Sequence, residues 1–249
     1  MTIARARGWR YLLRYQLPDF LVSRAGLPVL AAVMIGVMVY YTAGAGIEWQ
    51  SEDGERLAQQ VFSTLIGVVI TLGAFMGVAK LTTDDRANGW YRSYFSKPVK
   101  RTTFYAKQWA LHGVTLVLLV GVLGMAWQLA TNSVSVKEAM VVTALTWIML
   151  GGVGFLLSVL TNQDAGLLFI AYVLSMVLHS VKDQRNSPMW GWLREVTRLT
   201  LPTQKLEYVK DLLYAGQPIP WGHAGFVIGY GAVAFVIGVI LLRRLSLAR

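Results

Sequence analysis

The feature that most constrains this chain is a series of six long apolar stretches, inside which no Asp, Glu or Arg occurs. A helix needs roughly 20 apolar residues to cross the hydrocarbon core of a bilayer. Only 14% of the residues are charged, whereas an ordinary soluble domain carries about a quarter. The pattern predicts an all-α integral membrane protein in which residues 1–249 form a single polytopic domain. The six predicted transmembrane helices cover residues 26–46, 58–80, 109–131, 139–161, 165–181 and 222–242.

The distribution of basic residues predicts how these helices are oriented. With the N-terminus inside, the inner segments hold 15 of the 23 Lys and Arg residues but only 4 of the 13 acidic residues. The positive-inside rule therefore places both termini in the cytoplasm and predicts a multi-pass protein of the cell membrane. A full-length apolar span follows the basic N-terminus without a cleavage pattern, so we expect the first helix to be retained rather than removed as a signal peptide.

Two segments outside the spans show helical spacing of apolar residues. In residues 1–25, Arg7, Arg10 and Arg14 lie opposite an apolar face, which predicts an interfacial helix on the inner leaflet or, equally, a simple basic anchor. Residues 182–221 are expected to form an extracellular cap of short amphipathic helices, acting either as a lid or as a gate. The apolar positions of the cap are Met189, Trp190, Leu193, Val196, Leu206, Val209, Leu212 and Leu213.

The predicted spans contain few residues that could bind ions or catalyse a reaction. Proton pumps and secondary transporters generally place ionisable groups inside the bilayer, yet only His112, His179 and His223 come close to it here. We expect these histidines to be interfacial and satisfied by water or lipid headgroups rather than to form a metal or proton site. Cysteine is absent, and no nucleotide-binding or hydrolase motif occurs. The sequence thus predicts a non-enzyme without its own cofactor or metal, so uphill transport would need energy from another subunit.

Hydroxyl and aromatic residues recur in the second and fifth spans. Such positions could line a pathway for an amphipathic substrate, but on the residues alone ordinary packing is the favoured explanation. They are Ser63, Thr64, Thr71, Phe75, Phe169, Tyr172, Ser175 and Met176. Two small-residue patterns, Gly73-x-x-x-Gly77 and Gly225-x-x-x-Gly229, are expected to serve helix packing within the chain.

The inner loop at 84–101 has the composition of a docking element. Asp84 and Asp85 suit the cap and first turn of a short helix. The loop holds four aromatic residues, among them Trp90 and Tyr91, which is more than a simple connecting turn needs. Aromatic residues and arginine are concentrated at protein interfaces. The basic residues that follow would meet the anionic inner leaflet.

The same loop resembles the type-2 ABC exporter permease family. The residues that carry the resemblance are Asp85, Gly89, Ser96, Pro98, Val99, Arg101, Tyr105 and Lys107. A second match is the segment Leu201-Pro202-Thr203 with the helix-forming residues 206–216 after it, which is similar to the segment before the family's last span. The chain departs from the family at Leu201, where Asn is usual, and at Gln204. The resemblance covers the whole chain in topology and extends to the basic tail at Arg243.

The resemblance implies a half-transporter in which two six-span chains, identical or related, enclose the pathway within the membrane lipid. Each chain would dock on a separate cytoplasmic ATPase subunit that binds ATP and Mg²⁺, and nucleic acid is not an expected partner. The coupling residues would be Asp84, Asp85, Arg86, Gly89, Trp90, Tyr91, Tyr94 and Phe95, with a second contact at Asn162 and Asp164. The substrate pathway would include Phe62, Thr71, Phe75, Phe169, Tyr172 and Met176.

Two other classes stay open. One is a non-transporting membrane scaffold or assembly protein, and the other is an ATP-independent six-span carrier. The aromatic inner loop favours the exporter because only an exporter needs a dedicated ATPase dock. The uncharged pathway favours a hydrophobic or amphipathic cargo, such as a drug, a lipid or a peptide, over a small ion. The outward direction of transport rests on the family resemblance alone.

Overall fold

The computed structural model describes residues 33, 36, 51–78, 82, 100–131, 135–161, 163–182 and 201–244. All regular structure in this part of the chain is helical. The helices are α4 (Glu52–Val78), α7 (Arg101–Thr131), α8 (Val136–Thr146), the π-helical segment η2 (Trp147–Gly151), α9 (Gly152–Leu160), α10 (Asp164–Lys182), α12 (Thr203–Tyr214) and α13 (Trp221–Arg244).

Four of the described helices are long and apolar enough to cross a membrane, which indicates a multi-pass membrane protein. They span Arg56–Val78, Arg101–Leu129, Val136–Leu160 and Trp221–Arg244. The predicted fifth span is helical as α10, but its apolar part, Asp164–Val177, is shorter than these four. The predicted first span, apart from Val33 and Gly36, and the predicted N-terminal helix lie outside the described residues.

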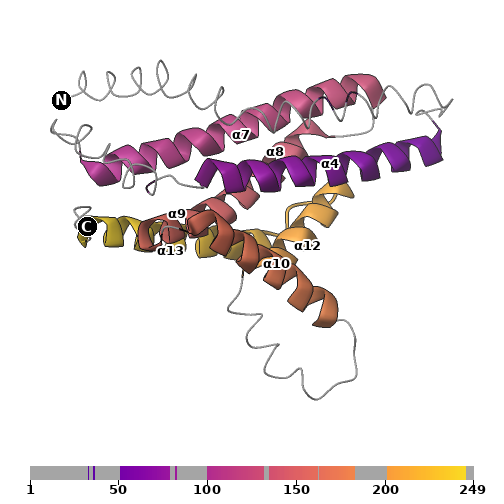
Figure 1. The fold of residues 1–249 in the computed structure, drawn as a ribbon. Helices are drawn as coiled ribbons and strands as arrows, with labels where there is room; N and C mark the ends of the chain where they lie inside the picture. Colours follow the sequence, from indigo (N-terminus) through magenta and orange to yellow (C-terminus); the bar gives the residue numbers. More distant parts are fainter. Residues whose placement is uncertain are drawn as a thin grey trace, which may run out of the picture.

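The long helices run alternately in opposite directions (Figure 1). Consequently α4, α9 and α13 finish at the end of the bundle where α7 and α10 begin, and α12 lies towards the other end (Figure 1). The continuous helix α8–η2–α9 is central, because α8 packs mainly on α7 whereas η2 and α9 pack on α13.

Local sequence signals mark several helix ends. Ser51 precedes α4, and its Oγ accepts a hydrogen bond of 3.1 Å from the backbone N–H of Gly54, as an N-cap does. After the last residue of α12, Tyr214, comes the C-cap residue Ala215 and then Gly216, whose φ is +70°. There the N–H of Gln217 donates to the Leu212 carbonyl at 2.9 Å and the N–H of Gly216 to the Leu213 carbonyl at 3.0 Å. This is the Schellman arrangement, which favours glycine because its φ is positive.

The interface between the central helix and α13 is unusually close. A Cβ atom at Gly152 would lie 2.1 Å from the carbonyl oxygen of Gly231, and one at Gly231 would lie 2.1 Å from the carbonyl oxygen of Ile148. Only glycine lets two helix backbones approach in this way. Beside the contact, the ring of Phe235 lies 4.5 Å from that of Trp109, centroid to centroid.

Polar side chains inside the bundle join helices to one another. Nδ1 of the buried His112 on α7 donates to the Gly77 carbonyl of α4 at 2.7 Å, since a carbonyl can only accept. Likewise Thr82 Oγ1 donates to the Ser158 carbonyl of α9 at 2.5 Å. His112 is therefore bonded to the protein backbone, and not to water or lipid headgroups as expected from the sequence, because its side chain is buried between helices.

The segment α12 has the amphipathic pattern that the sequence predicts for the cap. Leu206, Val209 and Leu213 are buried in the main core. Ser175 Oγ on α10 donates to the Leu201 carbonyl at 2.9 Å, and Gln59 Nε2 on α4 donates to the Tyr214 carbonyl at 2.9 Å. The helix is therefore anchored to the membrane-spanning bundle at both of its ends.

Candidate functional site

A cavity of about 450 Å³ lies between α4, α8, α10 and α12. Its size is within the range usual for small-molecule sites. The wall mixes apolar side chains with hydroxyls and one ion pair. The lining residues are Ser63, Thr64, Gly67, Val68, Ile70, Thr71, Leu72, Val142, Thr146, Tyr172, Met176, Leu206, Glu207 and Lys210.

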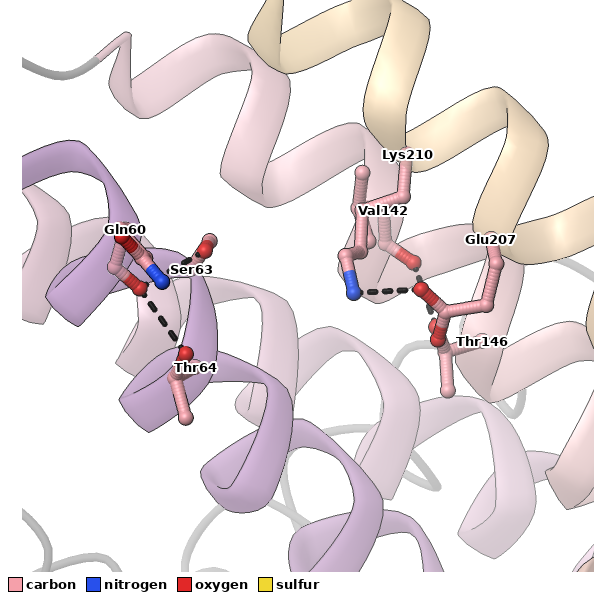
Figure 2. Close-up of polar contacts among 7 residues, drawn as sticks. All are labelled: Gln60, Ser63, Thr64, Val142, Thr146, Glu207 and Lys210. Carbon is pink, nitrogen blue, oxygen red and sulfur yellow. Dashed lines mark hydrogen bonds and ion pairs between the residues drawn. The ribbon is translucent and has the colours of Figure 1, made fainter. Parts of the chain in front are cut away.

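Three of the hydroxyl groups of the cavity are bonded to their own helices. Ser63 Oγ and Thr64 Oγ1 both donate to the Gln60 carbonyl at 2.9 Å, and Thr146 Oγ1 donates to the Val142 carbonyl at 2.8 Å (Figure 2). Each of these bonds uses the single hydroxyl proton and leaves the oxygen lone pairs for another group. The three oxygens can therefore accept hydrogen bonds from a ligand.

The charged groups of the cavity come from the polar face of α12. Lys210 Nζ lies 2.5 Å from Glu207 Oε2, and the two residues are three positions apart on the same face of the helix. Figure 2 shows the pair beside Thr146 of α8 and facing α4 across a gap. The Glu207 side chain keeps 43% of its surface exposed and Lys210 keeps 23%. The pair makes this end of the cavity polar without giving it a net charge.

A tyrosine at the end of α12 is close to the same charges. The hydroxyl of Tyr214 is buried and makes no hydrogen bond within the described part of the chain. Burial, together with the negative charges of Glu138 and Glu207, raises the pKa of Tyr214 above its ordinary value of 10.0. The phenol is therefore neutral at physiological pH and supplies no charge to the cavity.

The predicted pathway residues separate into two groups. Thr71, Tyr172 and Met176 line the cavity. Phe75 and Phe169 instead form an aromatic cluster with Tyr172, with Phe75 edge-on to both rings at centroid distances of 6.0 Å and 5.6 Å. Phe62 is only 1% exposed and packs on Trp127 of α7 at 5.8 Å, so it belongs to the core and not to the cavity wall.

Three polar lining residues were not predicted from the sequence. Thr146 is one of four hydroxyl residues in an otherwise apolar span and carries no pattern that distinguishes it from a packing residue. Glu207 and Lys210 do carry a signal, because opposite charges three residues apart lie on one face of an amphipathic helix. What the sequence does not reveal is that this face turns towards α4.

Most of the predicted coupling residues lie outside the described part of the chain. These are Asp84, Asp85, Arg86, Gly89, Trp90, Tyr91, Tyr94, Phe95 and Asn162. Asp164 is described as the first residue of α10 and is 3% exposed. Its Oδ1 accepts a hydrogen bond of 2.8 Å from the N–H of Ala165.

The two histidines whose side chains the structure describes lie away from the cavity wall. Within the described residues, no three His, Asp or Glu side chains gather closely enough to hold a metal ion. His223 stacks on Tyr208 at 4.8 Å, and His112 is bonded to Gly77, so neither takes part in the cavity wall. A hydroxyl-lined cavity with one neutralised ion pair is typical of recognition. Comparison with known protein families, with curated proteins and with solved structures found no match.

Proposed function

We propose that this chain is the permease subunit of an ATP-driven exporter of the type-2 ABC class, located in the cell membrane with both termini in the cytoplasm. Two such chains, identical or related, form the pathway, and each docks on a separate ATPase subunit that binds ATP and Mg²⁺. The cargo is a hydrophobic or amphipathic compound. The proposal rests on the resemblance of the 84–101 loop together with the cavity between the spans.

The observation that carries most weight is the character of that cavity. It lies among membrane helices, and the part of α4 that lines it, from Ser63 to Leu72, contains no ionisable residue. A pump that couples to protons or ions needs ionisable groups within the bilayer. The ion pair of the wall comes from α12, which is not one of the four long apolar helices, and α4 contributes hydroxyls and apolar side chains. Such a wall suits a pathway that binds cargo passively and moves when an external motor acts on it.

The arrangement of the helices offers a place for such a motor. The 84–101 loop joins the end of α4 to the start of α7, at the same end of the bundle as Asp164 and as the end of α13. Arg101, Arg243 and Arg244 also lie at this end, in agreement with a cytoplasmic position. Closure of an ATPase dimer against this end would move α4 and α7 as rigid bodies and reshape the cavity.

Affinity purification from the native membrane in mild detergent, followed by mass spectrometry, tests the proposal. We expect a near-stoichiometric ATPase with the wild-type chain, and we expect the double variant Trp90→Ala/Tyr91→Ala to insert normally but lose the ATPase. The matched control is Trp221→Ala/Tyr208→Ala, which removes the same two residue types from exposed positions at the opposite end of the bundle. This control should retain the ATPase.

Two results would contradict the proposal. If no ATPase copurifies with the wild-type chain, even with Mg²⁺ and a trapped nucleotide analogue, the chain is a scaffold or an ATP-independent carrier. If the Trp90→Ala/Tyr91→Ala variant transports normally, residues 84–95 are not the coupling element.

A further inference from the structure

We infer that the cavity between α4, α8, α10 and α12 binds the ammonium group of an amphipathic amine, with Glu207 as the counter-ion and the apolar part of the ligand along Val68, Leu72 and Met176. The inference rests on the proposed function for its role in transport, but binding itself requires only the cavity.

The first step is the supply of hydrogen-bond acceptors. Ser63, Thr64 and Thr146 each donate their only hydroxyl proton to a backbone carbonyl. What they present to a ligand is therefore lone pairs, which accept but do not donate. A ligand that carries several N–H donors matches these three groups, whereas a carboxylate or phosphate, which can only accept, does not.

The second step concerns the carboxylate oxygen of Glu207 that is not bonded to Lys210. The Oε2 atom is bonded to Lys210, while Oε1 accepts no hydrogen bond from the part of the chain that the structure describes. With 43% of its side chain exposed, the carboxylate is open to a second cation. An ammonium group bound here would form a charge-assisted hydrogen bond, which is about twice as strong as a neutral one.

The third step is the polarity gradient along the cavity. The lining stretch of α4 from Ser63 to Leu72 rises roughly 14 Å, at 1.5 Å per residue. Ser63 and Thr64 of α4 lie across from Thr146 and the ion pair, as Figure 2 shows, and further along the wall Val68, Leu72 and Met176 are apolar. A ligand with one polar end and a hydrophobic body fits this gradient, because each part meets a matching wall.

The role of Lys210 follows from the same geometry. In the empty cavity its ammonium neutralises Glu207 and so avoids an unpaired carboxylate. When a ligand amine arrives, Lys210 competes with it for the same carboxylate. The two charged residues should therefore have opposite effects: loss of Glu207 weakens amine binding, and loss of Lys210 strengthens it.

The test measures equilibrium binding to the full chain in lipid nanodiscs, with empty nanodiscs subtracted. The probes are dansyl-labelled dodecylamine and its matched dodecanol and dodecanoate analogues. We expect the amine to bind best, Glu207→Gln to weaken the amine about tenfold or more, and Lys210→Met to tighten it about threefold. Asp211→Asn, which alters an exposed carboxylate on α12 outside the cavity wall, should change nothing.

Three other results would contradict the inference. Equal binding of the three probes, or no effect of Glu207→Gln in a variant that elutes as a folded species, overturns the inference. A preference for dodecanoate that Lys210→Met abolishes would show an anion site instead. Because the assay contains no ATPase, its failure is distinct from failure of the copurification experiment, and either proposal can stand without the other.

Discussion

Replacement of Gly231 by Ala should loosen the interface between α13 and the central helix. The added Cβ would lie 2.1 Å from the Ile148 carbonyl oxygen and 2.9 Å from the Cα atom of Met149, where an ordinary contact begins at 3.4 Å. Both neighbours are backbone atoms, so rotation of a side chain cannot relieve the overlap. The two helices must separate, and every contact between them weakens.

The expected cost follows from what overpacking does in well-packed interiors. Such insertions typically cost about 1–3 kcal/mol, and the backbone-to-backbone overlap puts Gly231→Ala at the upper part of that range. A loss of about 2 kcal/mol corresponds to a decrease in Tm of roughly 4–8 °C for a chain of this size. Thermal unfolding in detergent, followed by fluorescence-detected size-exclusion chromatography, measures the decrease.

Gly229→Ala provides the matched control. It lies two residues away on the same helix, and a Cβ there would meet nothing within 4 Å in the described part of the chain. The control should stay within about 1 °C of wild type, or gain slightly because Ala is the better helix former. Equal decreases in the two variants would refute the reasoning, since the loss would then be a property of α13 and not of the close approach.

Three further predictions follow from the same structure. Ser175→Ala removes the bond to the Leu201 carbonyl and should lower the free energy of unfolding by about 1 kcal/mol, seen as a lower Tm. Folding raises the pKa of Tyr214, so above its ordinary pKa of 10.0 the unfolded state loses the phenol proton first and is favoured. The Tm should therefore fall as the pH rises above that value, and it should fall less steeply in Tyr214→Phe. Met176→Trp should fill the cavity and reduce ATP-driven transport at least about tenfold in vesicles, whereas the exposed Met125→Trp on α7 should not.

Hydropathy was sufficient to place the centres of the described spans but not the starts of two helices. The second span was predicted to begin at residue 58, yet α4 begins at Glu52, and the third was predicted to begin at 109, yet α7 begins at Arg101. The additional turns are polar, so a search for apolar residues omits them. Backbone hydrogen bonds continue past the apolar part because a capping residue, Ser51, and not the end of the hydrophobic pattern, determines where α4 starts.

The candidate site was only partly accessible from the sequence. Hydroxyl and aromatic residues on the second and fifth spans correctly drew attention to Thr71, Tyr172 and Met176, which line the cavity. The family resemblance added Phe62, which instead faces Trp127 because α7, and not α10, packs on that side of α4. Which face of an apolar helix meets which neighbour depends on contacts distant in sequence, and a helix that is apolar all round carries no pattern to reveal it.

Small-residue patterns show the same limit. Gly225-x-x-x-Gly229 has the spacing of a packing face, yet neither glycine has a neighbour within 4 Å in the described residues. The close approach on α13 occurs at Gly231, which is paired with Gly152 and has no partner glycine four residues away in its own helix. The spacing identifies helices that can approach each other, while the actual contact point depends on how the partner helix is rotated.

The π-helical segment Trp147–Gly151 gives the central helix a property that a uniform α-helix lacks. A π turn accommodates one residue more than an α turn, and each residue of an α-helix corresponds to roughly 100° of rotation about its axis. The side chains of α9 are therefore offset by about that angle from the positions that the repeat in α8 would give them. Deletion of one residue within 147–151 would restore a regular repeat and, in doing so, turn the α9 surface that now meets α13 towards a different neighbour.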